Sequence, residues 1–170
     1  MSKKTAIIYS FHTQKSKKVA EKVIEAFGAD NIEVVNAEEL TKDVIEKYDN
    51  FIISSPTWFD GELPNYWDEF IPDLEELDLS KKTFAIFGLG DQKGYPENFC
   101  DAIGLMAEIL EDCGAKLVGE TPTEGYNYES SKAQRGDVFV GLPIDQENQA
   151  RLTKKRVADW VEKIKGEFFN

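Results

Sequence analysis

Two aromatic loops hold the residues best suited to binding a flat ligand. The first covers residues 55–63 (SPTWFDGEL) and the second covers residues 88–99 (GLGDQKGYPENF). Both segments are rich in Gly or Pro, which is typical of loops, and each presents one large ring, Trp58 or Tyr95. One such ring is usually explained by ordinary packing. Two on neighbouring loops indicate a slot that could hold a planar aromatic molecule between them.

Each aromatic loop follows a short, continuous apolar run. Residues 51–53 (FII) precede the first loop, and residues 84–87 (FAIF) precede the second. Runs of this kind are typical of strands buried on both faces in a parallel sheet. The carboxyl ends of such strands meet at one edge of the sheet, where open α/β folds bind their ligands. The two loops are therefore expected to lie side by side at that edge.

A third segment could bind an anion. It runs from Ser10 to Ser16 (SFHTQKS), between an expected strand at residues 5–9 and an expected helix at residues 16–27. Unpaired N–H groups at a helix start favour phosphate, and the hydroxyls of Thr13 and Ser16 would add donors. The simpler alternative is that these residues only cap the helix. His12, the only histidine, has no adjacent nucleophile or carboxylate in the sequence, so we expect at most a secondary phosphate contact from it.

Strand and helix patterns alternate along the chain. This predicts a parallel sheet with helices on both faces, joined by right-handed crossovers. Further strands are expected at residues 32–35 and 116–118, and further helices at 37–48, 66–71 (ending before Pro72), 99–110 and 149–168. The alternation breaks over about residues 121–148, which are rich in Gly, Pro, Ser and Asn. We interpret this stretch as an insertion that splits the fifth strand, which resumes near Val138.

Composition indicates one domain covering residues 1–170. The formal net charge of −12 makes nucleic acid and anionic membranes poor partners, and it favours basic ones. Two cysteines without metal-ligand spacing do not indicate a disulfide framework. The amino-terminal sequence has no cleavage-site pattern and no apolar stretch of membrane-spanning length, so we expect a cytoplasmic protein.

Three motifs in the right order resemble the flavodoxins of the long-chain class. These are PTWxxGEL from Pro56, GxGDQxGYxxNFxDA from Gly88, and the pair SKA at 131–133 and GL at 141–142 within the insertion. The resemblance covers essentially the whole chain. It implies a flavodoxin-like doubly wound sheet of five parallel strands in the order 2-1-3-4-5, its fifth strand interrupted by the insertion. It also implies one non-covalent FMN and low-potential transfer of one electron at a time.

The resemblance also assigns roles to individual residues. It places Tyr95 on one face of the flavin ring and Trp58 on the other. The chain departs from the family at Phe11, where Thr or Ser is usual, and at Gln14, where Gly is usual. The residues expected around the cofactor are Ser10, Phe11, His12, Thr13, Gln14, Lys15, Ser16, Pro56, Thr57, Trp58, Phe59, Asp60, Gly61, Leu89, Gly90, Asp91, Tyr95, Asn98, Phe99 and Cys100.

Three other functions were compared with the sequence, namely dinucleotide binding, phospho-acceptor signalling and an FMN-dependent reductase. The glycines at 88, 90 and 94 do not match a dinucleotide fingerprint, because the third comes one residue late and the run follows the fourth strand. A phospho-acceptor domain would need acidic residues where Tyr9, Ser10, Ser54 and Ser55 stand. The serious rival is an FMN-dependent NAD(P)H or quinone reductase on the same fold. For the carrier we expect a monomer that meets basic flavoprotein reductases and other redox enzymes transiently.

Overall fold

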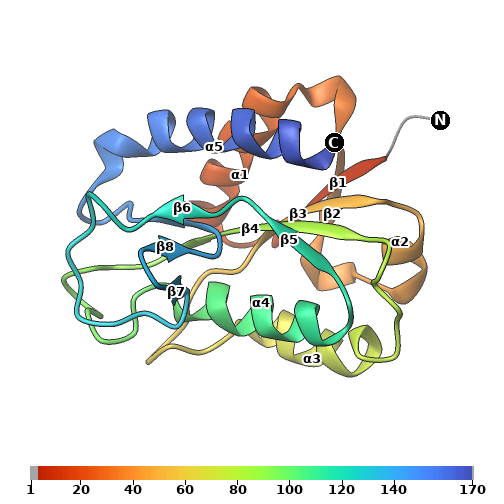
Figure 1. The fold of residues 1–170 in the computed structure, drawn as a ribbon, viewed down its shortest axis with the longest axis horizontal. Helices are drawn as coiled ribbons and strands as arrows, with labels where there is room; N and C mark the ends of the chain where they lie inside the picture. Colours follow the sequence, from red (N-terminus) through yellow and green to blue (C-terminus); the bar gives the residue numbers. More distant parts are fainter. Residues whose placement is uncertain (1–3, 170) are drawn as a thin grey trace.

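A computed structural model describes residues 4–169 and contains a parallel sheet at its centre (Figure 1). Five strands follow the order β2-β1-β3-β4-β5, and a sixth short strand, β9, pairs with β4 beyond the end of β5. This confirms the expected doubly wound flavodoxin-like topology. The strands are β1 (Thr5–Tyr9), β2 (Glu33–Asn36), β3 (Asn50–Ser54), β4 (Thr83–Leu89), β5 (Lys116–Val118) and β9 (Leu142–Ile144).

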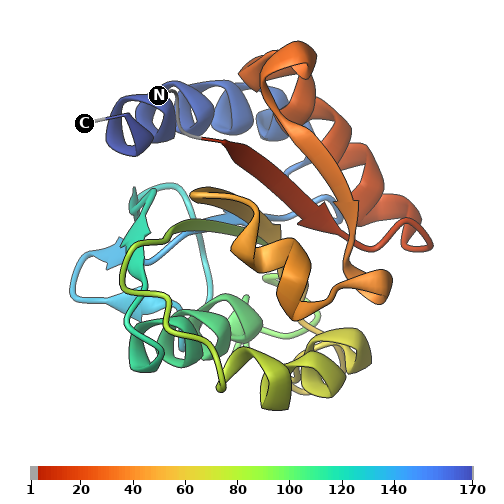
Figure 2. The same cartoon turned by 90° about the vertical axis from the view of Figure 1, so that its right-hand side faces the viewer.

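Helices cover both faces of the sheet, as the two views show (Figures 1 and 2). One face packs against α1 (Gln14–Phe27) and α5 (Thr153–Phe168), and the other against α3 (Asn65–Leu74) and α4 (Asp101–Asp112). Side chains alternate between the two cores along each strand, as Ile7 and Ile8 do in β1. Because both faces of β1, β3 and β4 are buried, these strands have nearly continuous apolar sequences.

The insertion forms a small antiparallel sheet of its own. Strand β8 (Val138–Phe139) pairs with β6 (Thr121–Pro122) and β7 (Gln134–Arg135). The expected resumption of the fifth strand near Val138 is therefore wrong in its position, because the parallel pairing with β4 begins only at Leu142. The chain passes so close to β4 before that point that a Cβ on Gly141 would lie 2.2 Å from the carbonyl oxygen of Ile86.

The SKA motif of the insertion docks on the start of α4. The backbone N–H of Lys132 donates to the carboxylate of Asp101 at 2.8 Å. Gly104 permits this approach, since a Cβ there would lie 2.2 Å from the Lys132 carbonyl oxygen. The insertion is thus attached to the helix that follows the second aromatic loop.

Several expected helix boundaries are wrong. Residues 37–48 form two short pieces, η2 (Ala37–Glu39) and α2 (Lys42–Glu46), because Thr41 adopts an extended conformation and its hydroxyl caps α2. Helix α3 continues through Pro72, because burying Leu74 on the same face outweighs one lost backbone hydrogen bond. Helix α4 begins at residue 101 rather than 99, and α5 begins at 153, after the 3₁₀ turn η3 (Ala150–Leu152).

The 3₁₀ turn η1 (Ala29–Asn31) follows α1. Within residues 4–169, no helix is long and apolar enough to cross a membrane.

Candidate functional site

A cavity of about 490 Å³ lies at the carboxyl edge of the sheet. It is built from three segments predicted from the sequence, namely the start of α1 and the loops that follow β3 and β4, and from a fourth segment that follows β9. The lining residues are Thr13, Gln14, Lys15, Ser16, Pro56, Thr57, Trp58, Leu89, Gly90, Asp91, Tyr95, Gln146 and Glu147. Both large aromatic residues and the expected anion-binding helix start therefore lie around one space.

The start of α1 has free backbone donors. Thr13 is extended and makes no capping bond, because its hydroxyl donates instead to the Ser10 carbonyl oxygen at 3.1 Å. Among residues 4–169, no hydrogen bond is made by the backbone N–H groups of Gln14, Lys15 and Ser16. The first turn of α1 also has no acidic residue. An anion placed here would find several N–H groups, the positive end of the helix and the ammonium of Lys15.

The preceding turn is held by a carboxylate from another segment. Glu38 in η2 accepts a hydrogen bond from the Ser10 hydroxyl and pairs with Nδ1 of His12 at 3.0 Å. The ring of Phe11 packs on Tyr9 with centroids 5.1 Å apart, and its backbone N–H donates to the side chain of Asn36. Ser10, Phe11 and His12 consequently stand beside the cavity rather than in its lining.

A tight hairpin carries the first aromatic ring. The backbones of Trp58 and Glu62 pair in both directions, at 2.8 and 2.7 Å, around a turn in which Phe59 has a φ of 52°. The indole of Trp58 meets the ring of Tyr66 edge to face at a centroid distance of 5.8 Å, which fixes its orientation toward the cavity. At the tip, Phe59 and Asp60 are exposed, whereas Gly61 is buried.

The hydroxyl of Thr57 ties the first loop to α4. It accepts a hydrogen bond from the backbone N–H of Ala102 at 3.0 Å, while the Thr57 N–H donates to the Leu89 carbonyl oxygen. The next residue, Gly90, donates to the carbonyl oxygen of Ile144 at the end of β9. These bonds join the three strand ends that line the cavity.

Asp91 organises the second aromatic loop. Its carboxylate accepts hydrogen bonds from the backbone N–H groups of Gly94, at 2.8 Å, and Lys93, at 3.1 Å. These bonds, chiefly that from Gly94, hold the pKa of Asp91 below its usual value. The backbone N–H of Tyr95 donates to the Asp91 carbonyl oxygen. Tyr95 is 47% exposed and lines the cavity, so it is available to a ligand there.

Three further expected site residues lie behind this loop. The side chains of Phe99 and Cys100 are fully buried, Phe99 against Tyr128 and Cys100 with Sγ 3.7 Å from the Gly88 carbonyl oxygen. The amide of Asn98 donates to Asp101 at 3.2 Å. None of the three lines the cavity, so their side chains support the loop from the protein side.

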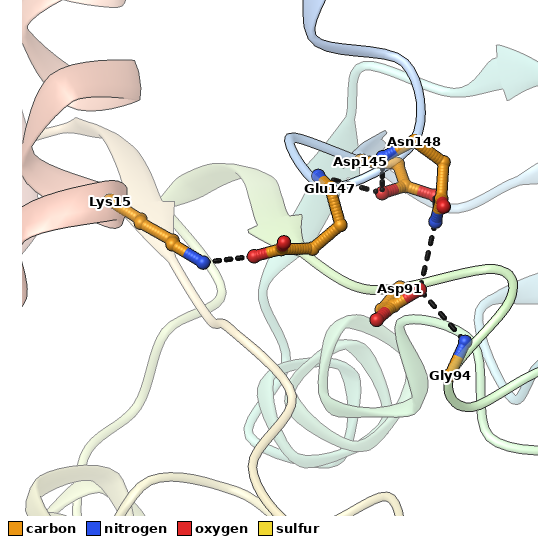
Figure 3. Close-up of polar contacts among 6 residues, drawn as sticks. All are labelled: Lys15, Asp91, Gly94, Asp145, Glu147 and Asn148. Carbon is orange, nitrogen blue, oxygen red and sulfur yellow. Dashed lines mark hydrogen bonds and ion pairs between the residues drawn. The ribbon is translucent and has the colours of Figure 1, made fainter.

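The fourth wall was not predicted from the sequence. Gln146 and Glu147 line the cavity, and Glu147 pairs with Lys15 at the start of α1 (Figure 3). The buried carboxylate of Asp145 holds this segment by accepting bonds from Glu147, Asn148 and Gln92. The sequence signal for this wall is limited to the short apolar run that ends at Ile144, and the pairing of that run with β4 is not visible in the local sequence.

A wider groove of about 710 Å³ lies at the opposite, amino-terminal edge, between Phe27, Ile32 and Tyr48. It contains neither of the aromatic loops nor the start of α1. Parallel sheets bind ligands at the other edge, where helix N-termini point. The smaller cavity is therefore the candidate site.

Comparisons with known proteins agree with this geometry. The family model described as flavodoxin matches residues 7–160. The flavodoxin of Haemophilus influenzae is 42% identical over 159 residues, covering 93% of this chain and 91% of the relative. Flavodoxin 1 of Escherichia coli K12 is 41% identical over 164 residues, covering 96% and 93%.

A solved structure, that of Fusobacterium nucleatum flavodoxin bound to flavin mononucleotide, superimposes with a TM-score of 0.92. It is 34% identical, with 98% of this chain and 99% of that chain covered. The chain belongs to the flavodoxin family.

Proposed function

We propose that this chain binds one FMN non-covalently in the cavity and carries single electrons between other redox proteins. Membership of the flavodoxin family and the FMN-bound structural neighbour support this assignment. The observation that carries it is the start of α1, where three backbone N–H groups and Lys15 stand without an acidic residue in the first helical turn. A phosphate group fits there, and the cavity leads from it to the aromatic rings.

The phosphate would be held by the first turn of α1. The N–H groups of Gln14, Lys15 and Ser16 would donate to its oxygens, with the Thr13 hydroxyl beside them. Charge-assisted bonds of this kind contribute about 1.5 to 3 kcal/mol each. Phe11 adds no donor to the phosphate, because its ring packs on Tyr9 and its backbone N–H already donates to Asn36.

The flavin ring would lie between Trp58 and Tyr95. When bound, FMN supplies a ring system that takes up and releases electrons one at a time. The chain controls this chemistry by charge, because the carboxylates of Asp60, Glu62 and Asp91 disfavour negative charge on the ring. The electron-rich phenol of Tyr95 acts in the same direction. The arrangement therefore favours a low potential for the second electron.

We propose basic flavoprotein reductases as the partners that load the carrier. Exposed acidic residues surround the aromatic loops, namely Asp60, Glu62 and Glu97, and the whole chain has a net charge of −12. Complementary charge speeds encounter while leaving the complex short-lived, as a shuttle requires. A reductase acting on a small substrate would need room over the flavin. Tyr95 stacked on that face would occupy it, which favours a carrier over the FMN-dependent reductase.

A binding titration tests the proposal. The chain freed of flavin should quench the fluorescence of one equivalent of FMN and bind riboflavin more weakly, because only FMN reaches the start of α1. Equal affinity for the two flavins would mean that residues 10–16 only begin a helix and bind no phosphate. Failure to bind either flavin would refute the proposed function.

A further inference from the structure

Lys15 and Glu147 form an ion pair between two segments far apart in the sequence (Figure 3). Lys15 belongs to the first turn of α1, and Glu147 to the segment after β9, 132 positions later in the chain. Both residues line the cavity, with side chains 65% and 48% exposed. The pair therefore stands beside the free N–H groups at the start of α1, which is where the proposed phosphate site lies.

The position of Glu147 is set by a buried hub. Oδ1 of Asp145 accepts from the backbone N–H groups of Glu147 at 3.1 Å and Asn148 at 3.0 Å. Oδ2 accepts from the backbone and side-chain nitrogens of Gln92 and from Nδ2 of Asn148, at 2.8 to 3.0 Å. Asp145 is 1% exposed, so these bonds are shielded from water. Glu147 thus extends from an anchored turn rather than from a free loop.

We propose that Glu147 is an internal competitor of the cofactor's phosphate. Its carboxylate pairs with the ammonium of Lys15 and places a negative charge beside the proposed phosphate site at the start of α1. It thereby lowers the affinity of the chain for FMN relative to flavins that have no phosphate. This inference rests on the proposed function, since it concerns the same cavity.

Charge explains the direction of the effect. A phosphate monoester carries about −1.5 to −2 charges at pH 7 and needs the positive groups around it. Lys15 is the only cation among the residues that line the cavity, and Glu147 and Asp91 are the acidic ones. To bind the phosphate, Lys15 must leave Glu147 or share its charge between two anions. Replacing Glu147 by a neutral residue of the same shape removes this competition.

The test compares Glu147→Gln with the unmodified chain, using FMN and riboflavin as probes. Glu147→Gln should lower the dissociation constant for FMN by about two- to fivefold, the range expected for an exposed ion pair, and leave riboflavin unchanged. Glu76→Gln is the matched control, because Glu76 forms an exposed pair with Lys42 away from the cavity. Glu76→Gln should leave the dissociation constants for FMN and riboflavin unchanged. In a chain that also has Lys15→Gln, Glu147→Gln should lower the dissociation constant for FMN much less.

A second readout needs no flavin. Inorganic phosphate should raise the melting temperature of the flavin-free Glu147→Gln chain more than that of the unmodified chain. Weaker or unchanged FMN binding, or an equal change for FMN and riboflavin, would overturn the inference. If the unmodified chain binds FMN in preference to riboflavin, such a result counts against Glu147 alone. If it binds neither, the proposed function itself fails.

Discussion

Tyr95 is the side chain on which the proposed cofactor environment depends most. Its ring lines the cavity, and it is 47% exposed. Tyr95→Ala should weaken FMN binding about two- to tenfold, as expected for a stacking energy of about 0.5 to 1.5 kcal/mol, and should raise the potential of the second electron. Tyr95→Phe is the control that keeps the stack. If Tyr95→Ala alters neither affinity nor potential, the ring is not part of the site.

Phe11 shows how the structure refines a departure from the family pattern. The sequence suggested that Phe11 replaces a hydroxyl donor, but its ring lies against Tyr9 at 5.1 Å. Phe11→Thr should therefore lower the melting temperature slightly by removing this contact. It should change the affinities for FMN and riboflavin by the same factor, as measured by fluorescence titration. Selective tightening of FMN would instead show that the new hydroxyl reaches the phosphate.

Part of the candidate site could be predicted from individual residues of the sequence. Trp58 and Tyr95 could be predicted because large rings on Gly- and Pro-rich loops have few packing explanations, and the loops follow buried strands. Gln146 and Glu147 could not, because their place depends on a strand of three residues, β9, that pairs with β4 far away in sequence. No local pattern encodes such a pairing.

The turn after β9 is the element that joins the two ends of the cavity. Its hub, Asp145, connects Glu147 at the helix end to Gln92 in the second aromatic loop. Asp145→Asn puts an amide group among donors, so we expect a loss of about 2 to 3 kcal/mol in the free energy of unfolding. Asp159→Asn, which breaks an exposed pair with Lys155, should cost less than about 1 kcal/mol. Equal losses in chemical denaturation would contradict the role of the hub.

The turn at residues 91–95 makes stability depend on pH. The pKa of Asp91 is lowered in the folded chain, chiefly by the Gly94 N–H. Its ionised form therefore contributes stability above its ordinary pKa of about 3.9, and this contribution is lost as pH falls through the lower folded value. Asp91→Asn should narrow the difference in melting temperature between pH 7 and about pH 3. If the melting temperature of Asp91→Asn depends on pH as that of the unmodified chain does, the hydrogen bonds to Asp91 make no net contribution to stability.

Strands were easier to predict than helix ends. Buried strands such as β1 and β3 have continuous apolar sequences, and the structure confirms them. The single helix expected over residues 37–48 was wrong because Thr41 favours a cap over a helix interior. The helix expected to end before Pro72 is longer than predicted. Burial of the apolar face of α3 extends that helix beyond the proline. A local cap decided the first case, and tertiary packing overrode a local signal in the second.

The charge of the whole molecule bears on how it meets its partners. A net charge of −12 acts over long range and speeds the approach of a basic protein, but salt screens it, with a Debye length of about 10 Å at 0.1 M. Acidic residues at the aromatic loops, Asp60, Glu62 and Glu97, would direct that approach toward the proposed flavin edge. Fast and salt-dependent electron transfer is therefore the behaviour expected of the complete chain.

Stopped-flow reduction of the FMN-loaded chain tests the central claim most directly. NADPH alone should reduce it slowly or not at all, whereas NADPH with a basic flavoprotein reductase should reduce it rapidly. The second rate should fall as ionic strength rises above its optimum. Rapid oxidation of NADPH by this chain alone, together with rates that do not respond to salt, would contradict the carrier and identify a reductase.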